Sequence, residues 1–89
     1  MVLYEGDPRA VSEALEKEAE SVRARGMKPG IIDFRGDIQE AARFFFARLR
    51  GLDRDGVDLI LCAGVAEEGL GEAVMDRMRK AAGHHIVEV

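Results

Sequence analysis

The stretch "VDLILCAGVAEEGLGEAVMDRMRKAAG", residues 57–83, decides the fold class. Its first seven residues form a nearly continuous apolar run, which is typical of a central parallel strand covered on both faces. Gly69 and Gly71 then flank Leu70 at the start of a helix that the apolar periodicity predicts over residues 70–82. A strand, a short loop and a helix of this length make one unit of an α/β fold.

The rest of the chain repeats this alternation. We predict strands at residues 1–5, 30–34 and 85–89, and helices that begin after Asp7 and Asp37, two residues suited to capping a helix start. Strands joined by helices require right-handed crossovers and a mostly parallel sheet. We therefore expect one domain over residues 1–89, with element order βαβαβαβ, three α/β/α layers and a small four-stranded, Rossmann-like sheet. The expected strand order is 2-1-3-4.

Composition excludes several classes of protein. A chain of 89 residues has room for one compact domain, and its net charge of −4 argues against direct binding of duplex nucleic acid, which needs a clustered basic face. No apolar run approaches the ~20 residues of a membrane span. Cys62 is the single cysteine, and the first residues lack the pattern of a secretion signal, so we expect a cytoplasmic protein.

The "GLG" segment allows two interpretations. A dinucleotide-binding loop follows the first strand and has a third glycine, whereas this segment follows the third strand and has Val74 at that place. Glu67 and Glu68 would also repel a phosphate at this helix start. We favour the interpretation that Gly69 and Gly71 allow a sharp turn and close packing, and keep a ligand loop as the alternative.

Other reactive residues give no coherent site. Cys62 falls within the buried strand and is expected to be a small core residue. His84 and His85 are neighbours in an extended segment and point in opposite directions, so we expect no metal site. Arg77 shares a helix face with Lys80, which could hold an anion but also suits the negative end of the helix dipole.

The second predicted helix is more apolar than one sheet face requires. Phe44 and Phe46 extend the apolar surface around the helix, beyond the core stripe that includes Phe45. We expect part of this surface to meet a partner.

Residues 41–83 closely resemble the C-terminal domain of the threonylcarbamoyl-AMP synthases, the YrdC-related enzymes of tRNA modification. The residues that carry the match are Leu49-Arg50, Asp53, Gly56-Val57-Asp58, Glu67-Glu68-Gly69-Leu70-Gly71, Ala73, Met75, Arg77 and Arg79-Lys80-Ala81-Ala82. Phe44 and Asp76 stand where the family usually has asparagine. The chain also has four predicted strands where the family domain usually has five.

The resemblance implies an accessory domain acting as a stand-alone chain. In the family, ATP, threonine and bicarbonate bind to a separate catalytic domain, so we expect no catalytic residue, cofactor or metal here. The first hypothesis is an accessory or regulatory role in threonylcarbamoyladenosine biosynthesis, through contact of Phe44 and Phe46 with a YrdC-type catalytic subunit or a second copy. The alternative is a nucleotide or other anion at the carboxyl ends of the first and third strands, bound by residues from the set Arg35, Gly64, Glu68, Gly69, Gly71 and Arg77.

Overall fold

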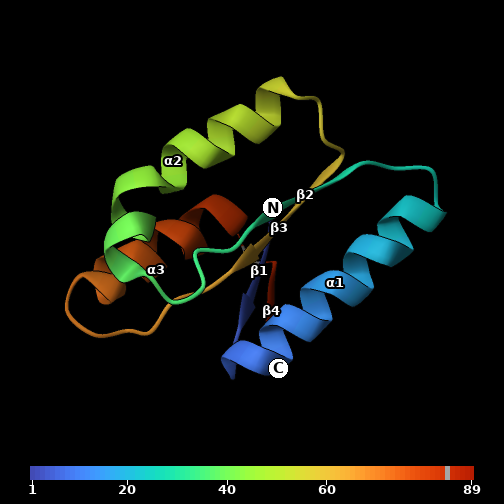
Figure 1. Ribbon diagram of the computed structural model, residues 1–89. Helices are drawn as coiled ribbons and strands as arrows, with labels where there is room; N and C mark the ends of the chain where they lie inside the picture. Colours follow the sequence, from blue (N-terminus) through green and yellow to red (C-terminus); the bar gives the residue numbers. More distant parts are fainter. Residues whose placement is uncertain (84) are drawn as a thin grey trace.

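The computed structural model describes residues 1–83 and 85–89, so the expectation for His84 lies outside the described residues. Strands and helices alternate along the chain as expected (Figure 1). Their bounds are β1 Val2–Glu5, α1 Pro8–Ala24, β2 Pro29–Ile32, α2 Ile38–Arg54, β3 Leu59–Ala63, α3 Leu70–Ala82 and β4 Ile86–Glu88. The α/β class and the predicted bounds of α3 are confirmed.

All three strand pairings are parallel, and the sheet order is β2-β3-β1-β4. The predicted order, 2-1-3-4, was wrong in its middle pair, although it placed β2 and β4 correctly at the edges. Both orders are compatible with right-handed crossovers, so the crossover rule did not decide between them. In the protein β3 lies between β1 and β2, with Leu3 opposite Cys62 and Ile31 opposite Leu61.

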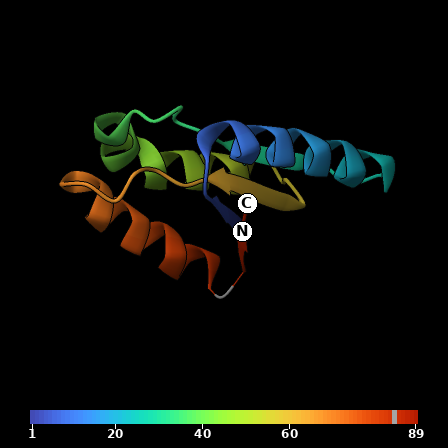
Figure 2. The ribbon, with the colours of Figure 1, turned by 90° about the horizontal axis from the view of Figure 1, so that it is seen from below.

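The helices form two layers around the sheet. Figure 2 shows α1 on one side of the strands and α3 on the other, and α2 packs beside α3. The α1 side buries Tyr4, Val11, Leu15, Ala19, Leu61 and Ala63. The other side buries a larger cluster that includes Leu3, Ile32, Phe45, Cys62, Val74 and Met78. The confirmed three-layer arrangement therefore has one helix on one face and two on the other.

Local sequence signals account for the starts of α1 and α2. Asp7 accepts a hydrogen bond from the Ala10 N–H at 3.1 Å, and Asp37 accepts one from the Glu40 N–H at 3.0 Å. Asp33 lies just beyond the end of β2, not inside it as predicted, because its carboxylate accepts the Arg35 N–H in a turn. Leu70, the first residue of α3, is 58% exposed, because the buried face of this helix is formed by Gly71, Val74, Met75, Met78 and Ala82.

None of the helices among the described residues combines the length and the hydropathy needed to cross a lipid bilayer.

Candidate functional site

A cavity of about 740 Å³ lies at the carboxyl ends of β1, β2 and β3. Its apolar lining comes from α1, β3 and α3, and comprises Pro8, Val11, Ala63, Val65, Ala66 and Met75. Its polar lining comprises Glu5, Arg9, Ser12, Asp33, Arg35 and Glu67. Because all strands are parallel, the segments that follow β1, β2 and β3 meet at this one end of the sheet.

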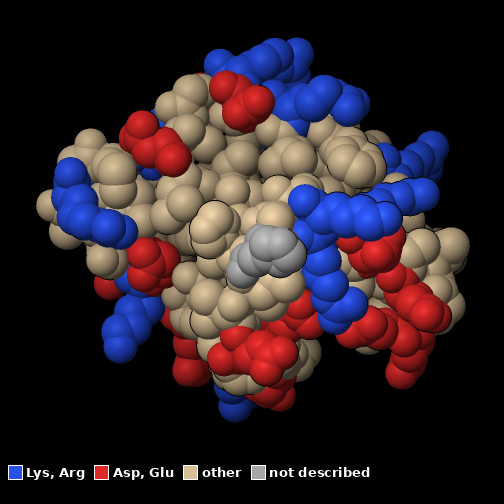
Figure 3. All heavy atoms as spheres, turned by 180° about the vertical axis from the view of Figure 1, so that it is seen from behind, with Lys and Arg blue, Asp and Glu red and all other residues tan. Residues whose placement is uncertain are grey.

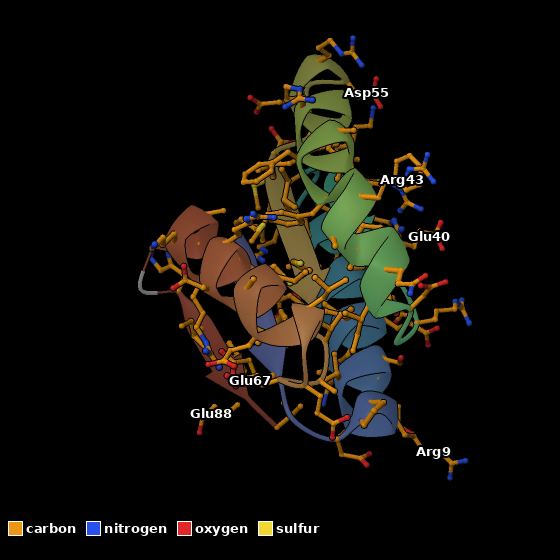
Figure 4. All side chains as sticks on the ribbon, turned by 90° about the vertical axis from the view of Figure 1, so that its left-hand side faces the viewer. Arg9, Glu40, Arg43, Asp55, Glu67 and Glu88 are labelled. Carbon is orange, nitrogen blue, oxygen red and sulfur yellow. The ribbon has the colours of Figure 1, made fainter. Side chains whose placement is uncertain are left out.

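Arg79 fixes one wall of the cavity. Its guanidinium donates to both Glu5 carboxylate oxygens at 2.8 and 3.1 Å, and to Glu67 Oε2 at 3.2 Å. These hydrogen bonds join the end of β1 to the loop that follows β3. Figure 4 shows Glu67 at the same end of the molecule as Arg9, whereas Asp55 lies at the opposite end. The hydrogen bonds from Arg79 lower the pKa of Glu67, and the hydrogen bonds to Glu5 and then Glu67 raise the pKa of Arg79.

The loop between β3 and α3 packs tightly against its surroundings. The Gly64 N–H donates to the Tyr4 carbonyl at 2.9 Å, and the Val65 N–H lies 3.2 Å from the Met75 sulfur. A Cβ atom on Gly71 would lie 1.8 Å from the Ala66 carbonyl oxygen, and Gly69 has a φ of 55° that favours glycine. Both glycines thus have a structural reason to be present, which supports the packing interpretation.

Arg35 is the one non-glycine residue with a positive φ among the described residues, at 52°. Its backbone N–H donates to Asp33 Oδ1 at 2.8 Å, and the next residue, Gly36, has a φ of 82°. A left-handed conformation costs an L-residue roughly 1–2 kcal/mol. The turn therefore holds Arg35 beside the cavity at an energetic cost.

The structure brings only some of the predicted site residues together. Arg35 and Gly64 line the cavity. Glu68 and Gly69 belong to the adjoining loop and Gly71 to the first turn of α3, and none of these three lines it. Arg77 lies away from the cavity, in a shallow groove between α2 and α3 that Phe46 also lines. The sequence reasoning missed Glu5, Arg9, Asp33, Glu67 and Arg79 as site residues. Glu5 ends β1 and Asp33 directly follows β2, and this position at a strand end is the signal that could have found these two.

The aromatic surface of α2 is present as expected. Phe44 is 43% exposed and Phe46 is 46% exposed. The Arg43 guanidinium lies 5.5 Å from the centre of the Phe44 ring, and the Phe46 ring centre lies 5.2 Å from that of buried Phe45. Cys62 is fully buried, and burial raises the pKa of its thiol to about 12, as expected for a core residue.

The sequence model of the threonylcarbamoyl-AMP synthase C-terminal domain matches residues 1–83. The chain belongs to this family. It is 39% identical to the threonylcarbamoyl-AMP synthase of Pyrococcus abyssi over 100 aligned positions, which cover 100% of the chain and 29% of that enzyme.

Solved structures of family members have the same fold. Pyrococcus abyssi Sua5 complexed with L-threonine superposes with a TM-score of 0.91 at 40% identity, over 99% of this chain and 29% of that one. The isolated C-terminal Sua5 domain from Pyrococcus horikoshii gives a TM-score of 0.79 at 32% identity, and the match covers 99% and 94% of the two chains. The 89 residues thus correspond to the C-terminal domain alone and span less than a third of the full-length relatives.

Proposed function

We propose that this domain acts as an accessory module of threonylcarbamoyl-AMP synthesis, and that α2 docks on a catalytic domain of the same family. Family membership supports the pathway, and the exposed Phe44 and Phe46 support α2 as the contact surface. Such a module would work in the cytoplasm, and it would carry out no chemistry of its own.

The two phenylalanines can supply a useful share of a binding energy. A phenylalanine buries roughly 150–250 Å² when it is fully covered, and these two rings are 43% and 46% exposed. Covering the remainder of each removes on the order of 90 Å² from water, which contributes about 2 kcal/mol per ring. Part of this gain offsets the entropy lost on association.

The face opposite to the one that Figure 1 presents carries both positively and negatively charged side chains (Figure 3). A large uncharged area lies at its centre, with many Lys and Arg side chains above and to the right of it and many Asp and Glu side chains below it (Figure 3). Because neither sign of charge covers this whole face in Figure 3, it gives no support to docking driven by charge alone.

The test is calorimetric titration of the chain into a separately produced catalytic domain of a threonylcarbamoyl-AMP synthase. The double variant Phe44→Ser/Phe46→Ser should weaken binding by more than about tenfold. A tenfold change corresponds to about 1.4 kcal/mol, which is less than the ~2 kcal/mol that burial of each ring contributes. Val87→Ser is the matched control, because Val87 is also an exposed apolar residue, at 38%, but lies on β4. Absence of binding by the unmodified chain, or equal affinity of the double variant, would refute α2 as the docking surface.

A further inference from the structure

We propose that the cavity at the carboxyl ends of β1, β2 and β3 is a binding site for a small organic anion, meaning a phosphate monoester or carboxylate carried on an apolar or planar body. The site is separate from the α2 surface, because the cavity lining includes neither Phe44 nor Phe46. This proposal therefore does not rest on the docking proposal.

The cavity has the size and position of a small-molecule site. Its volume of about 740 Å³ falls within the range of roughly 300–1,000 Å³ that is usual for ligand pockets. It lies at the junction of β1 and β3, the two central strands. The chain leaves β1 toward α1 on one face and leaves β3 toward α3 on the other, so the two loops diverge and leave a crevice between them.

Two arginines of the cavity lining are available to an anion. Its acidic side chains already have partners: Glu5 and Glu67 share Arg79, and Asp33 accepts the backbone N–H of Arg35. Arg9 and Arg35, by contrast, make no ion pair with any acidic residue of the described chain. Both guanidiniums therefore remain able to pair with an incoming anion, and Figure 4 shows the Arg9 side chain extending outward into solvent.

The same charges limit which anions fit. Glu5, Glu67 and Asp33 carry three negative charges and Arg9, Arg35 and Arg79 carry three positive ones, so the site as a whole is neutral. Each additional phosphate on a ligand would approach Glu67 or Glu5 without a further cation to meet it. We expect a monoester to bind better than a triphosphate. The apolar lining from Val11, Ala63 and Met75 would contact the uncharged body of the ligand.

Arg35 offers a test that separates binding from folding. Because Arg35 has a φ of 52°, Arg35→Gly relieves backbone strain while it removes the guanidinium. We expect this variant to be as stable as the parent or more stable, and to bind the anion at least tenfold more weakly. Arg43→Ala is the control, because it removes an exposed arginine from α2, outside the cavity.

The experiment is an NMR titration of the ¹⁵N-labelled chain with AMP, adenosine, inorganic phosphate and ATP. Saturable shifts with AMP at the amides of Gly6, Gly36, Gly64 and Ala66, weakened in Arg35→Gly and unchanged in Arg43→Ala, support the site. The proposal is overturned if no probe shifts these amides, or if Arg35→Gly binds AMP as the parent does. If adenosine bound as tightly as AMP, the phosphate group would not be recognised, and the proposal would be refuted. If inorganic phosphate bound as tightly as AMP, the uncharged body of the ligand would not be recognised, which would also refute it. ATP binding more tightly than AMP would contradict the charge argument.

Discussion

Substitution of Gly71 by alanine tests why a glycine stands in the first turn of α3, where the helix meets the loop that precedes it. The added Cβ would lie 1.8 Å from the Ala66 carbonyl oxygen, 3.0 Å from its carbonyl carbon and 3.3 Å from Ile38 Cδ1. An ordinary carbon–oxygen contact is about 3.3 Å, so the loop or the start of α3 must move by about 1.5 Å. If the glycine instead served a phosphate loop, alanine would affect ligand binding and leave stability nearly unchanged.

Two opposing effects set the expected loss of stability. Overpacking of this kind typically costs about 1–3 kcal/mol, with more where a backbone atom must yield. Alanine regains at most about 1 kcal/mol over glycine in a helix, and less in the first turn, where Gly71 lies. The net expectation is a loss of about 2 kcal/mol, which lowers the Tm of a domain of this size by about 8–16 °C.

Thermal unfolding followed by circular dichroism measures the effect, with Gly51→Ala as the matched control. Gly51 is also helical, but no atom lies within 4 Å of the Cβ it would gain, so this variant should be stabilised by about 0.5–1 kcal/mol. If Gly71→Ala proved as stable as Gly51→Ala, the close-packing explanation would be refuted.

Three further changes have defined outcomes. In Arg79→Ala, an NMR pH titration should show the Glu67 pKa returning to its ordinary range. In the parent this pKa is lowered, so the ion pair stabilises the fold at neutral pH. Its contribution is lost as the pH falls through the lowered pKa. An unchanged Glu67 midpoint would contradict the network. Native Cys62 should resist iodoacetamide at mildly alkaline pH, since its pKa is raised to about 12, and should react only after denaturation; rapid native labelling would show that the strand opens. Asp37→Ala should lower the free energy of unfolding in urea by about 1 kcal/mol through loss of the α2 cap, and no change in the urea midpoint would speak against that cap.

Most of the fold could be predicted because its signals are local. Asp7, Pro8 and Asp37 mark helix starts through hydrogen bonds within a few residues, and the apolar run at Leu59–Ala63 marks a central strand. The order of β1 and β3 could not be predicted in this way. Both strands are buried on both faces, and either order places α1 on one side and α2 and α3 on the other, so the apolar pattern is the same for both.

The candidate site was predicted only in part for a similar reason. The sequence shows which residues follow each strand, which was enough to point to Gly64 and Arg35. The partners of Arg79 depend on long-range geometry: Glu5 is 74 positions away in the chain, and the preceding arginine on the helix, Arg77, looks equally suitable in sequence. Only the orientation of α3 on the sheet distinguishes the two.

The central place of β1 also constrains how a nascent chain can fold. Within this domain Val2–Glu5 precedes the other strands in sequence, yet its partners are residues 61–63 and 86–88, so it remains unpaired until those residues have left the ribosome. The β2-α2-β3 unit is the first parallel pair that can close, over a much shorter loop. We therefore expect this unit to nucleate folding and β1 to insert late, which makes assembly slow for a domain of 89 residues.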